Sequence, residues 1–296
     1  MTELIERKLV GLDYLRAGCE LLGRIRNAHP TKGQFEAAEL NWWWAHHRST
    51  HDVEQLFWFD GAGNAEAAAI ATDWGGLIGL DVAVMPDAPT DHIAHVLDRG
   101  LAHTAELGYA AVDVLVDRAD DTMRSLLANR GFNPPEGEAA MQPDVEAWIA
   151  ADAVPPVSAL ADGYVLRSRP ETMSSPHHMA DERRPDVEER LLQGPMYRPD
   201  LDLVLLDDDG AVGGYGLFWF DPATAIGVVE PMHTNEGHRQ RGIARHILTE
   251  GLQRLVAIGA ERIKIVFFPD NTAAANLYTD VGFEPAKYTE MMSLRR

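Results

Sequence analysis

One segment of the chain combines residues that can bind an anion. Residues 238–245 read His-Arg-Gln-Arg-Gly-Ile-Ala-Arg, after a predicted strand and at the start of a predicted helix. A glycine turn before a helix exposes successive backbone N–H groups, and the helix dipole adds positive potential there. Three arginines, Arg239, Arg241 and Arg245, add charge around the turn. The segment therefore predicts a site for a phosphate-bearing ligand, the alternative being a plain helix-capping turn.

The neighbouring sequence predicts the elements that hold this segment. Apolar residues recur at helical spacing from residue 242 to 258, and Gly259 ends the pattern. The second half predicts a strand, a polar helical stretch, three strands, a helix, a strand, a helix and a strand, at residues 163–169, 171–192, 203–206, 212–220, 226–234, 242–258, 262–268, 271–280 and 288–294. A meander followed by alternating strands and helices indicates an α/β fold with a mixed sheet.

The chain divides near its middle. Residues 150–162 contain Pro155 and Pro156, which fit neither a helix interior nor a central strand, among small residues typical of a linker. We therefore expect one domain over residues 1–149 and a second over residues 163–296.

The two halves share a pattern at a fixed distance of 151 residues. Positions of the first half that recur there without a gap are Leu97, Gly100, Leu101, Gly108, Leu126, Gly131 and Phe132. Both halves also predict a helix, a strand and a second helix in the same order. An internal duplication explains this agreement.

Two motifs of the second half resemble the GCN5-related N-acetyltransferase (GNAT) superfamily. Residues 239–244, Arg-Gln-Arg-Gly-Ile-Ala, are similar to the family's signature Arg/Gln-x-x-Gly-x-Gly/Ala. Residues 271–283 are similar to its pattern Asn-x-x-Ala-x-x-Leu-Tyr-x-x-x-Gly-Phe. The resemblance is strong over residues 163–296 and extends to residues 1–144 only as a fold. It implies two tandem GNAT-like domains, the first one degenerate, an arrangement similar to that of the mycothiol synthases.

The resemblance implies acetyl-CoA as the cosubstrate. Its pyrophosphate would lie on the backbone N–H groups of residues 240–245, and its pantetheine arm along residues 232–234. Tyr278 would protonate the leaving thiolate, or else serve only as a packing aromatic side chain. The residues expected to bind the cofactor are Met232, His233, Thr234, Arg239, Gln240, Arg241, Gly242, Ile243, Ala244, Arg245 and Asn271.

The acceptor amine must also lose a proton. Some relatives place a glutamate twelve residues before the tyrosine, but this chain has Val266 there. Glu230, in an otherwise apolar strand, is the expected catalytic base, and a substrate-ammonium anchor is its alternative role. His233 is the second candidate, because strand alternation puts it on the opposite face.

The first half lacks these features. In the 151-residue register, Asp91 takes the place of Gly242 and Leu127 takes the place of Tyr278. A carboxylate would thus stand where a pyrophosphate should bind. We expect this half to complete the substrate cleft or to brace the active half.

Further polar and aromatic residues are candidates for the acceptor site. Tyr197, Trp219 and Asp221 lie where acceptor loops of the family often fall and are expected to line the acceptor site, with surface or core roles as the alternative. His177 and His178 follow Pro176 in a polar stretch and are expected to be solvated. No metal is expected.

The charge balance limits the partners. The 296 residues include 26 Lys and Arg against 46 Asp and Glu, a net charge of −20. Such acidity opposes nucleic acid and anionic membranes and favours cationic amines, or it serves only solubility. No apolar run reaches the ~20 residues of a membrane helix, and the N-terminal residues have no signal-peptide pattern. We therefore expect a cytoplasmic protein without a nucleic-acid or membrane partner.

These features together predict an acetyl-CoA-dependent N-acetyltransferase. It would transfer the acetyl group to the primary amine of a small cationic acceptor, by direct attack in a ternary complex. The alternatives are a non-catalytic acyl-CoA-binding sensor or scaffold, and a protein N-terminal or lysine acetyltransferase.

Overall fold

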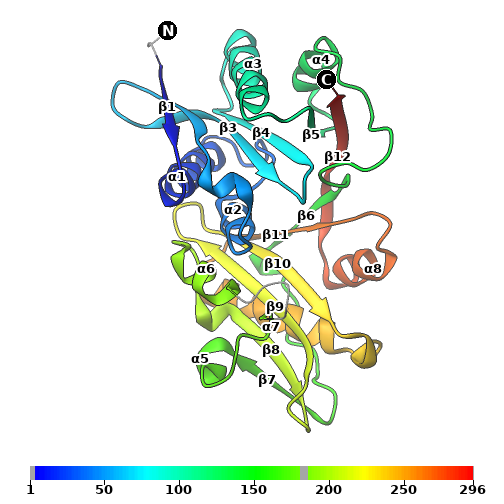
Figure 1. Ribbon diagram of the computed structural model, residues 1–296. Coiled ribbons are helices and arrows are strands. Elements are labelled where there is room, and N and C mark those ends of the chain that lie inside the picture. The colour runs from blue at the N-terminus through cyan, green and yellow to red at the C-terminus, as the bar shows by residue number, and fades with distance from the viewer. Residues whose placement is uncertain (1–3, 181–185, 296) are drawn as a thin grey trace. The chain divides into compact units, whose positions relative to one another are not determined.

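The chain forms two compact units in the computed structural model, which describes residues 4–180 and 186–295 (Figure 1). The first unit takes the residues up to 40, residues 47–145 and the residues from 287 on. The second takes residues 41–46 and 146–286. This division differs from the boundary expected at residues 150–162, since that segment lies wholly within the second unit.

The first unit is built on a mixed sheet. Its strands follow the order β1 (Ile5–Leu9), β2 (Gln55–Phe59), β3 (Ala65–Asp73), β4 (Ile78–Val84), β5 (Ala111–Asp117) and β12 (Glu284–Arg295). Neighbours are antiparallel except β4 and β5, which are parallel and meet at Gly79 and Asp113. The last strand of the chain therefore completes the sheet of the first unit.

Helices cover both faces of this sheet. They are α1 (Leu12–Ala28), α3 (Thr90–Glu106), α4 (Asp121–Ala128) and α2 (Ala37–Trp44), which runs on into the second unit. Gly18 of α1 lies against Ile70, whereas Gly100 of α3 lies against Ala69. Adjacent residues of a strand point to opposite faces, so α1 and α3 lie on opposite faces of the sheet.

A buried carboxyl group in this unit gives a testable pH dependence. Asp81 of β4 is 3% exposed, and its Oδ2 atom has no hydrogen-bond partner among residues 4–180 and 186–295. Burial, with a smaller contribution from Glu39, raises the pKa of Asp81 to about 7. At pH values between the pKa of Asp81 in the unfolded chain and about 7, the folded protein keeps a proton on Asp81 that the unfolded chain has lost. This group's contribution to stability therefore falls as pH rises across that window and is constant above it.

The substitution Asp81→Asn should remove this loss of folding stability at high pH. We expect the variant to gain on the order of 2–4 kcal/mol over the wild type at pH 8 and almost nothing at pH 4. Urea unfolding at the two pH values measures the difference. Asp208→Asn, at an exposed turn, is the matched control and should change neither value. An equal gain at both pH values would show that the carboxylate charge is not the cause.

The second unit repeats this plan. Its sheet has the order β6 (Val145–Ala150), β11 (Arg262–Phe267), β10 (Ile226–Thr234), β9 (Val212–Asp221), β8 (Asp202–Asp207) and β7 (Tyr164–Ser168). Strands β7 to β10 form an antiparallel meander, and β10 pairs with β11 in parallel. The meander and the mixed sheet confirm the α/β fold class predicted from the sequence.

The second unit also contains helices, of which α7 packs against the sheet. They are α5 (Arg169–Thr172), α6 (Val187–Gln193), α7 (Ile243–Ala257) and α8 (Thr272–Val281). Apolar residues of α7, including Leu248 and Leu252, share one buried core with Phe218 of β9 and Phe283. The core thus fixes the start of α7 against the end of β10, which is where the predicted anion-binding turn lies.

The segment expected to be a linker packs against α7. Ser158 donates its backbone N–H to Thr249 Oγ1 at 3.0 Å, and Pro155 accepts from Gln253 Nε2 at 2.8 Å. Residues 155–158 are therefore fixed to the second unit.

The predicted duplication agrees with the element order. The series β4, α3, β5, α4 in the first unit corresponds to β10, α7, β11, α8 in the second. A shift of 151 residues carries Ala111 at the start of β5 onto Arg262 at the start of β11, and Asp121 of α4 onto Thr272 of α8. Over the described residues, none of the helices has the length and apolar character needed to cross a membrane.

Candidate active site

A cleft opens where two parallel strands of the second unit separate. Strands β10 and β11 pair as far as Val229 and Ile265. Beyond this point a cavity of about 660 Å³ lies between the end of β10, the start of α7 and helix α8. It is lined by Met232, His233, Thr234, Arg239, Gln240, Gly242, Ile243, Ala244, Arg245, Asn271, Ala273, Ala274, Leu277, Tyr278 and Asp280. The structure thus brings together every residue expected to bind the cofactor except Arg241.

The loop at one end of the cleft has an unusual backbone. Gln240 has a φ of 61° and Gly242 a φ of 76°, both in the left-handed region. Helix α7 starts directly after Gly242, and its first turn has no acidic residue. The first N–H groups of a helix lack acceptors within that helix. This turn therefore presents backbone donors and the positive end of a helix dipole to the cleft.

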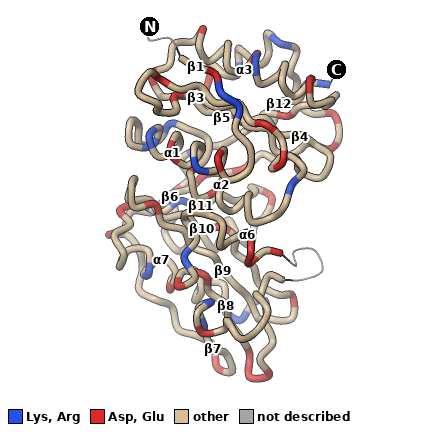
Figure 2. The backbone as a smooth tube through the Cα atoms, turned by 60° about the vertical axis from the view of Figure 1, so that its left-hand side comes forward, with Lys and Arg blue, Asp and Glu red and all other residues tan. Residues whose placement is uncertain are grey.

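Each arginine of this loop has a hydrogen-bond or ion-pair partner, and Arg239 and Arg245 line the cleft. Arg239 donates to the Thr234 carbonyl at 3.4 Å, and Arg241 donates to the Tyr164 hydroxyl at 3.2 Å. Arg245 pairs with Asp280 at 3.1 Å. Acidic residues outnumber basic ones in the chain, as the red and blue segments of Figure 2 show. This small basic loop is therefore a local exception that suits an anion.

Tyr278 of α8 lies at the other side of the cleft. Its ring contacts Phe267 and Phe283, and the residue is 7% exposed. Its hydroxyl makes no hydrogen bond with any residue that the structure describes. Burial raises the pKa of Tyr278 to about 12. The phenol therefore keeps its proton at neutral pH and has it available for donation.

Asn271 begins the helix that carries Tyr278. Its side-chain oxygen accepts from the Ala274 backbone N–H at 3.2 Å, so it is the N-cap of α8. The carboxylate of Asp120 does the same for α4 in the first unit, accepting from Met123 at 2.9 Å. Asn271, which belongs to the family motif, therefore caps helix α8 as well as lining the cleft.

Comparison with known proteins identifies the second unit. Residues 163–283 match the model of the acetyltransferase (GNAT) family. This region belongs to the GNAT family. Its cofactor motif and tyrosine motif both lie within the matched residues. We refer to residues 146–286 as the GNAT unit.

Solved structures extend the likeness to the whole chain. A tandem GNAT protein from the clavulanic acid biosynthesis pathway matches with a TM-score of 0.68 at 14% identity, over 99% of this chain and 98% of that one. A GCN5-related N-acetyltransferase from Sphaerobacter thermophilus matches with a TM-score of 0.60 at 17% identity, over 99% and 95%. At these identities the likeness concerns the fold, which is a tandem GNAT arrangement. No curated protein matches the chain.

The GNAT unit has a bulge that the sequence pattern did not predict. Val229 pairs with Phe218 but Met232 pairs with Gly216, so β10 gains one residue at Glu230 and Pro231. The Glu230 carbonyl accepts from Trp219 Nε1 at 2.7 Å. Glu230 is half-buried and is not among the residues that line the cleft.

The three residues expected to line the acceptor site are not among those that line this cleft. Trp219 is 1% exposed and packs in the interior. Asp221 caps the β9–β10 turn by accepting from Ala223 at 2.8 Å. It pairs with Ile226, at the opposite end of β10 from the cleft. Tyr197 donates its hydroxyl to Asp202 at 2.7 Å. These contacts give the three side chains structural roles, and their predicted part in the acceptor site stays a prediction.

Two histidines expected to be solvated are instead buried. The His177 ring donates from Nε2 to Asp202 at 2.8 Å, and the His178 ring stacks on it at 4.3 Å. Burial alone would raise the pKa of Asp202, but its contacts with His177 and His178 outweigh burial and hold that pKa well below its usual range. The polar sequence around these residues gave no sign of this, because their partner lies 24 or more residues away.

This cluster has the residue types of a metal site but not the proton arrangement. His177, His178 and Asp202 have ligand atoms within 4.8 Å of one another. However, His177 Nδ1 accepts from the Met179 backbone N–H at 3.1 Å. A neutral imidazole has one lone pair, so Nε2 carries the proton and donates to Asp202. The geometry therefore favours a hydrogen-bonded anchor for the loop after α5.

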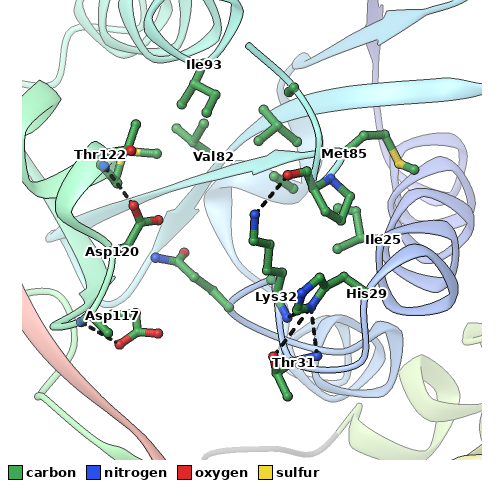
Figure 3. A pocket seen from close by; sticks show the side chains of 18 of the residues that line it. Ile25, His29, Thr31, Lys32, Val82, Met85, Ile93, Asp117, Asp120 and Thr122 are labelled. Carbon is green, nitrogen blue, oxygen red and sulfur yellow. Dashed lines mark hydrogen bonds between the residues drawn. The ribbon is translucent and has the colours of Figure 1, made fainter. Parts of the chain in front are cut away.

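The first unit has a corresponding cleft of about 580 Å³ (Figure 3), and residues 88–94 at the start of α3 have neither the glycine nor the arginines of residues 239–245. Asp91 lies in the first turn of α3 and accepts from the His92 backbone N–H at 2.9 Å. Lys32 donates to the Pro86 carbonyl at 3.0 Å, and Gln34 donates to the Leu115 carbonyl. The loop that carries Lys32 and Gln34 thus contacts β5 and the segment that follows β4.

Proposed function

We propose that the chain is an acetyl-CoA-dependent N-acetyltransferase whose GNAT unit carries the site. The observation that supports this most directly is the cleft itself. It has backbone donors at the start of α7 on one side and an unengaged tyrosine hydroxyl on the other. A site that only binds a cofactor needs the first feature, whereas acyl transfer also needs the second.

In the proposed complex, the N–H groups of residues 240–245 hold the pyrophosphate of acetyl-CoA. The pantetheine arm lies along residues 232–234, where no described residue pairs with β10 on its β11 side. The acceptor nitrogen attacks the thioester carbonyl carbon and the carbon–sulfur bond breaks. Tyr278 gives its proton to the leaving thiolate, and a base takes the proton from the nitrogen.

The acceptor that we propose is a small primary amine with a positive charge. The net charge of −20 favours the approach of cations by long-range attraction. A screen of small amines with acetyl-CoA, followed by detection of the free CoA thiol, tests the function. Thiol release that depends on one or more amines supports it. Binding of acetyl-CoA without release for any amine would instead indicate an acyl-CoA-binding scaffold, and release only with peptides would indicate a protein acetyltransferase.

The sequence leaves two roles open for Glu230: it could be the catalytic base, or it could bind the ammonium group of the acceptor. Since it does not line the cofactor cleft, we favour the anchor. Glu230→Gln should raise the acceptor KM roughly tenfold, as expected for a lost charged hydrogen bond, and leave kcat nearly unchanged. Glu236→Gln, at an exposed position of the next turn, is the control. A fall in kcat at constant KM would restore Glu230 as the base.

A further inference from the structure

His233 lies in the wall of the cleft just beyond the bulge of β10. It pairs with Tyr215 of β9, and the two rings stack with centroids 5.2 Å apart and planes 26° apart. Tyr215 in turn contacts His178 at 5.1 Å. The His233 ring is thus supported on one face by a ring that is itself in contact with the buried Asp202 cluster.

A neighbouring amide fixes the proton on this ring. Asn235 donates its Nδ2 to the Val212 carbonyl at 2.5 Å, and its backbone N–H to the Gly213 carbonyl at 3.0 Å. These bonds turn Oδ1 of Asn235 toward His233, 2.9 Å from Nε2. An amide oxygen only accepts, so Nε2 of His233 must carry the proton.

The other nitrogen of the ring then has the lone pair. Nδ1 of His233 makes no hydrogen bond within the part of the chain that the structure describes. The arrangement has the elements of an oriented base: one ring nitrogen donates to a fixed acceptor, and the other keeps a lone pair on an exposed residue of the cleft lining. Glu230 lies outside the lining of that cleft.

We propose that His233 is the general base of the acetyl transfer, an inference that rests on the function proposed above. The reacting amine is neutral when it attacks, any ammonium proton having been lost to solvent beforehand, and Nδ1 takes the one further proton that the nitrogen loses as the nitrogen–carbon bond forms. The resulting imidazolium keeps its Nε2 bond to Asn235. Tyr278 supplies the proton to the departing thiolate, so each proton has a donor and an acceptor.

Charged and titratable groups lie on the elements around His233. The charged or titratable groups near it are Tyr215 on β9, Glu236 and His238 in the turn after β10, and Arg239, Arg245, Tyr278 and Asp280, which line the same cleft. The two arginines oppose an imidazolium, and a bound phosphate group would screen them.

Removal of the ring is the first test. With an amine found by the screen, His233→Ala should lower kcat/KM roughly 100-fold or more, the usual size of a general-base contribution. Its affinity for acetyl-CoA should stay within about threefold, because the strand-like pairing proposed for residues 232–234 uses backbone groups that alanine keeps, and this also shows that the variant is folded. Added imidazole should restore at least part of the rate, since it can enter the space between Tyr215 and Asn235. His47→Ala, at an exposed position, is the control and should behave as the wild type.

Change of the orienting amide is the second test. Asn235→Asp puts a carboxylate beside Nε2 and should stabilise the imidazolium. The acid limb of the kcat/KM profile should then move to higher pH, by roughly one unit. A purely structural role for His233 would not move this limb.

The outcomes separate the two proposals. Suppose that the wild type transfers acetyl groups. If His233→Ala then retains the wild-type rate, His233 is not the base and the proposed function stands. The same conclusion follows if imidazole does not rescue His233→Ala and Asn235→Asp leaves the pH profile unchanged. If the wild type transfers to no amine, the proposed function fails and this inference fails with it.

Discussion

Gly242→Asp is expected to abolish the binding of acetyl-CoA. Gly242 has a φ of 76° directly before α7, and no heavy atom lies within 4 Å of the place of a Cβ atom. Aspartate would therefore fit in space, yet its carboxylate would face the phosphates. Like charges in contact cost several kcal/mol, and each 1.4 kcal/mol is tenfold in affinity. Titration calorimetry should show the Kd raised by about 100-fold or more.

Two variants separate charge from backbone strain in this test. Gly242→Asn has the same shape as aspartate without its charge, and asparagine tolerates the left-handed region, so its loss of affinity should be much smaller. Gly210→Asp puts the same residue at an exposed turn with a φ of 80°. It should bind acetyl-CoA as the wild type does. Equal losses for Asp and Asn at position 242 would assign the effect to the backbone.

The same titration counts the sites. We expect one acetyl-CoA for each wild-type chain, because the first unit has Asp91 at the corresponding helix start and the loop with Lys32 and Gln34 in contact with β5 and the segment that follows β4. A second equal site that survives Gly242→Asp would show that the first unit also binds the cofactor.

The sequence predicts most of the elements of the GNAT unit, since their determinants are local. The glycine turn, the apolar stripe of α7 and the Asn271 cap depend on residues close together in the chain. The helix expected at residues 242–258 lies at Ile243–Ala257, and the strand expected at 226–234 lies at Ile226–Thr234. The residues expected around the cofactor gather in one cleft for the same reason.

Features that depend on distant partners were not predictable in this way. The bulge at Glu230 and Pro231 is defined by the register with β9, and strand alternation alone gives no sign of it. The polar helical stretch expected at residues 171–192 overlaps the short helices α5 and α6, and residues 181–185 of it lie outside the described part. His177 appears solvated until Asp202 is placed beside it.

The division of the chain into two units also could not be predicted from the sequence. The proline pair at 155–156 suggested a boundary there. However, β6, before the prolines, lies beside β11, and β12 pairs with β5. Strand exchange of this kind depends on edge pairing between segments more than 100 residues apart, for which composition gives no signal.

Tyr278→Phe should reduce turnover by a large factor without affecting cofactor binding. The substitution keeps the ring that packs on Phe267 and Phe283 and removes only the hydroxyl. Loss of a proton donor to the thiolate lowers kcat by roughly 10–1000-fold. Affinity for acetyl-CoA should change by less than about threefold, because the phosphates are held at the start of α7. Tyr288→Phe, at a half-exposed position, serves as the control.

The pH profile distinguishes proton donation from packing at Tyr278. Burial raises the pKa of Tyr278 to about 12, so the phenol stays protonated up to about pH 10 and should cause no basic limb below that pH. The Phe variant should therefore run at a lower rate throughout, with the acid limb of the wild type intact, because that limb belongs to the base. The comparison requires that chemistry limits the rate, which an absence of dependence on solvent viscosity establishes. Under that condition, a Phe variant with wild-type kcat would leave Tyr278 a packing residue and assign protonation of the thiolate to water.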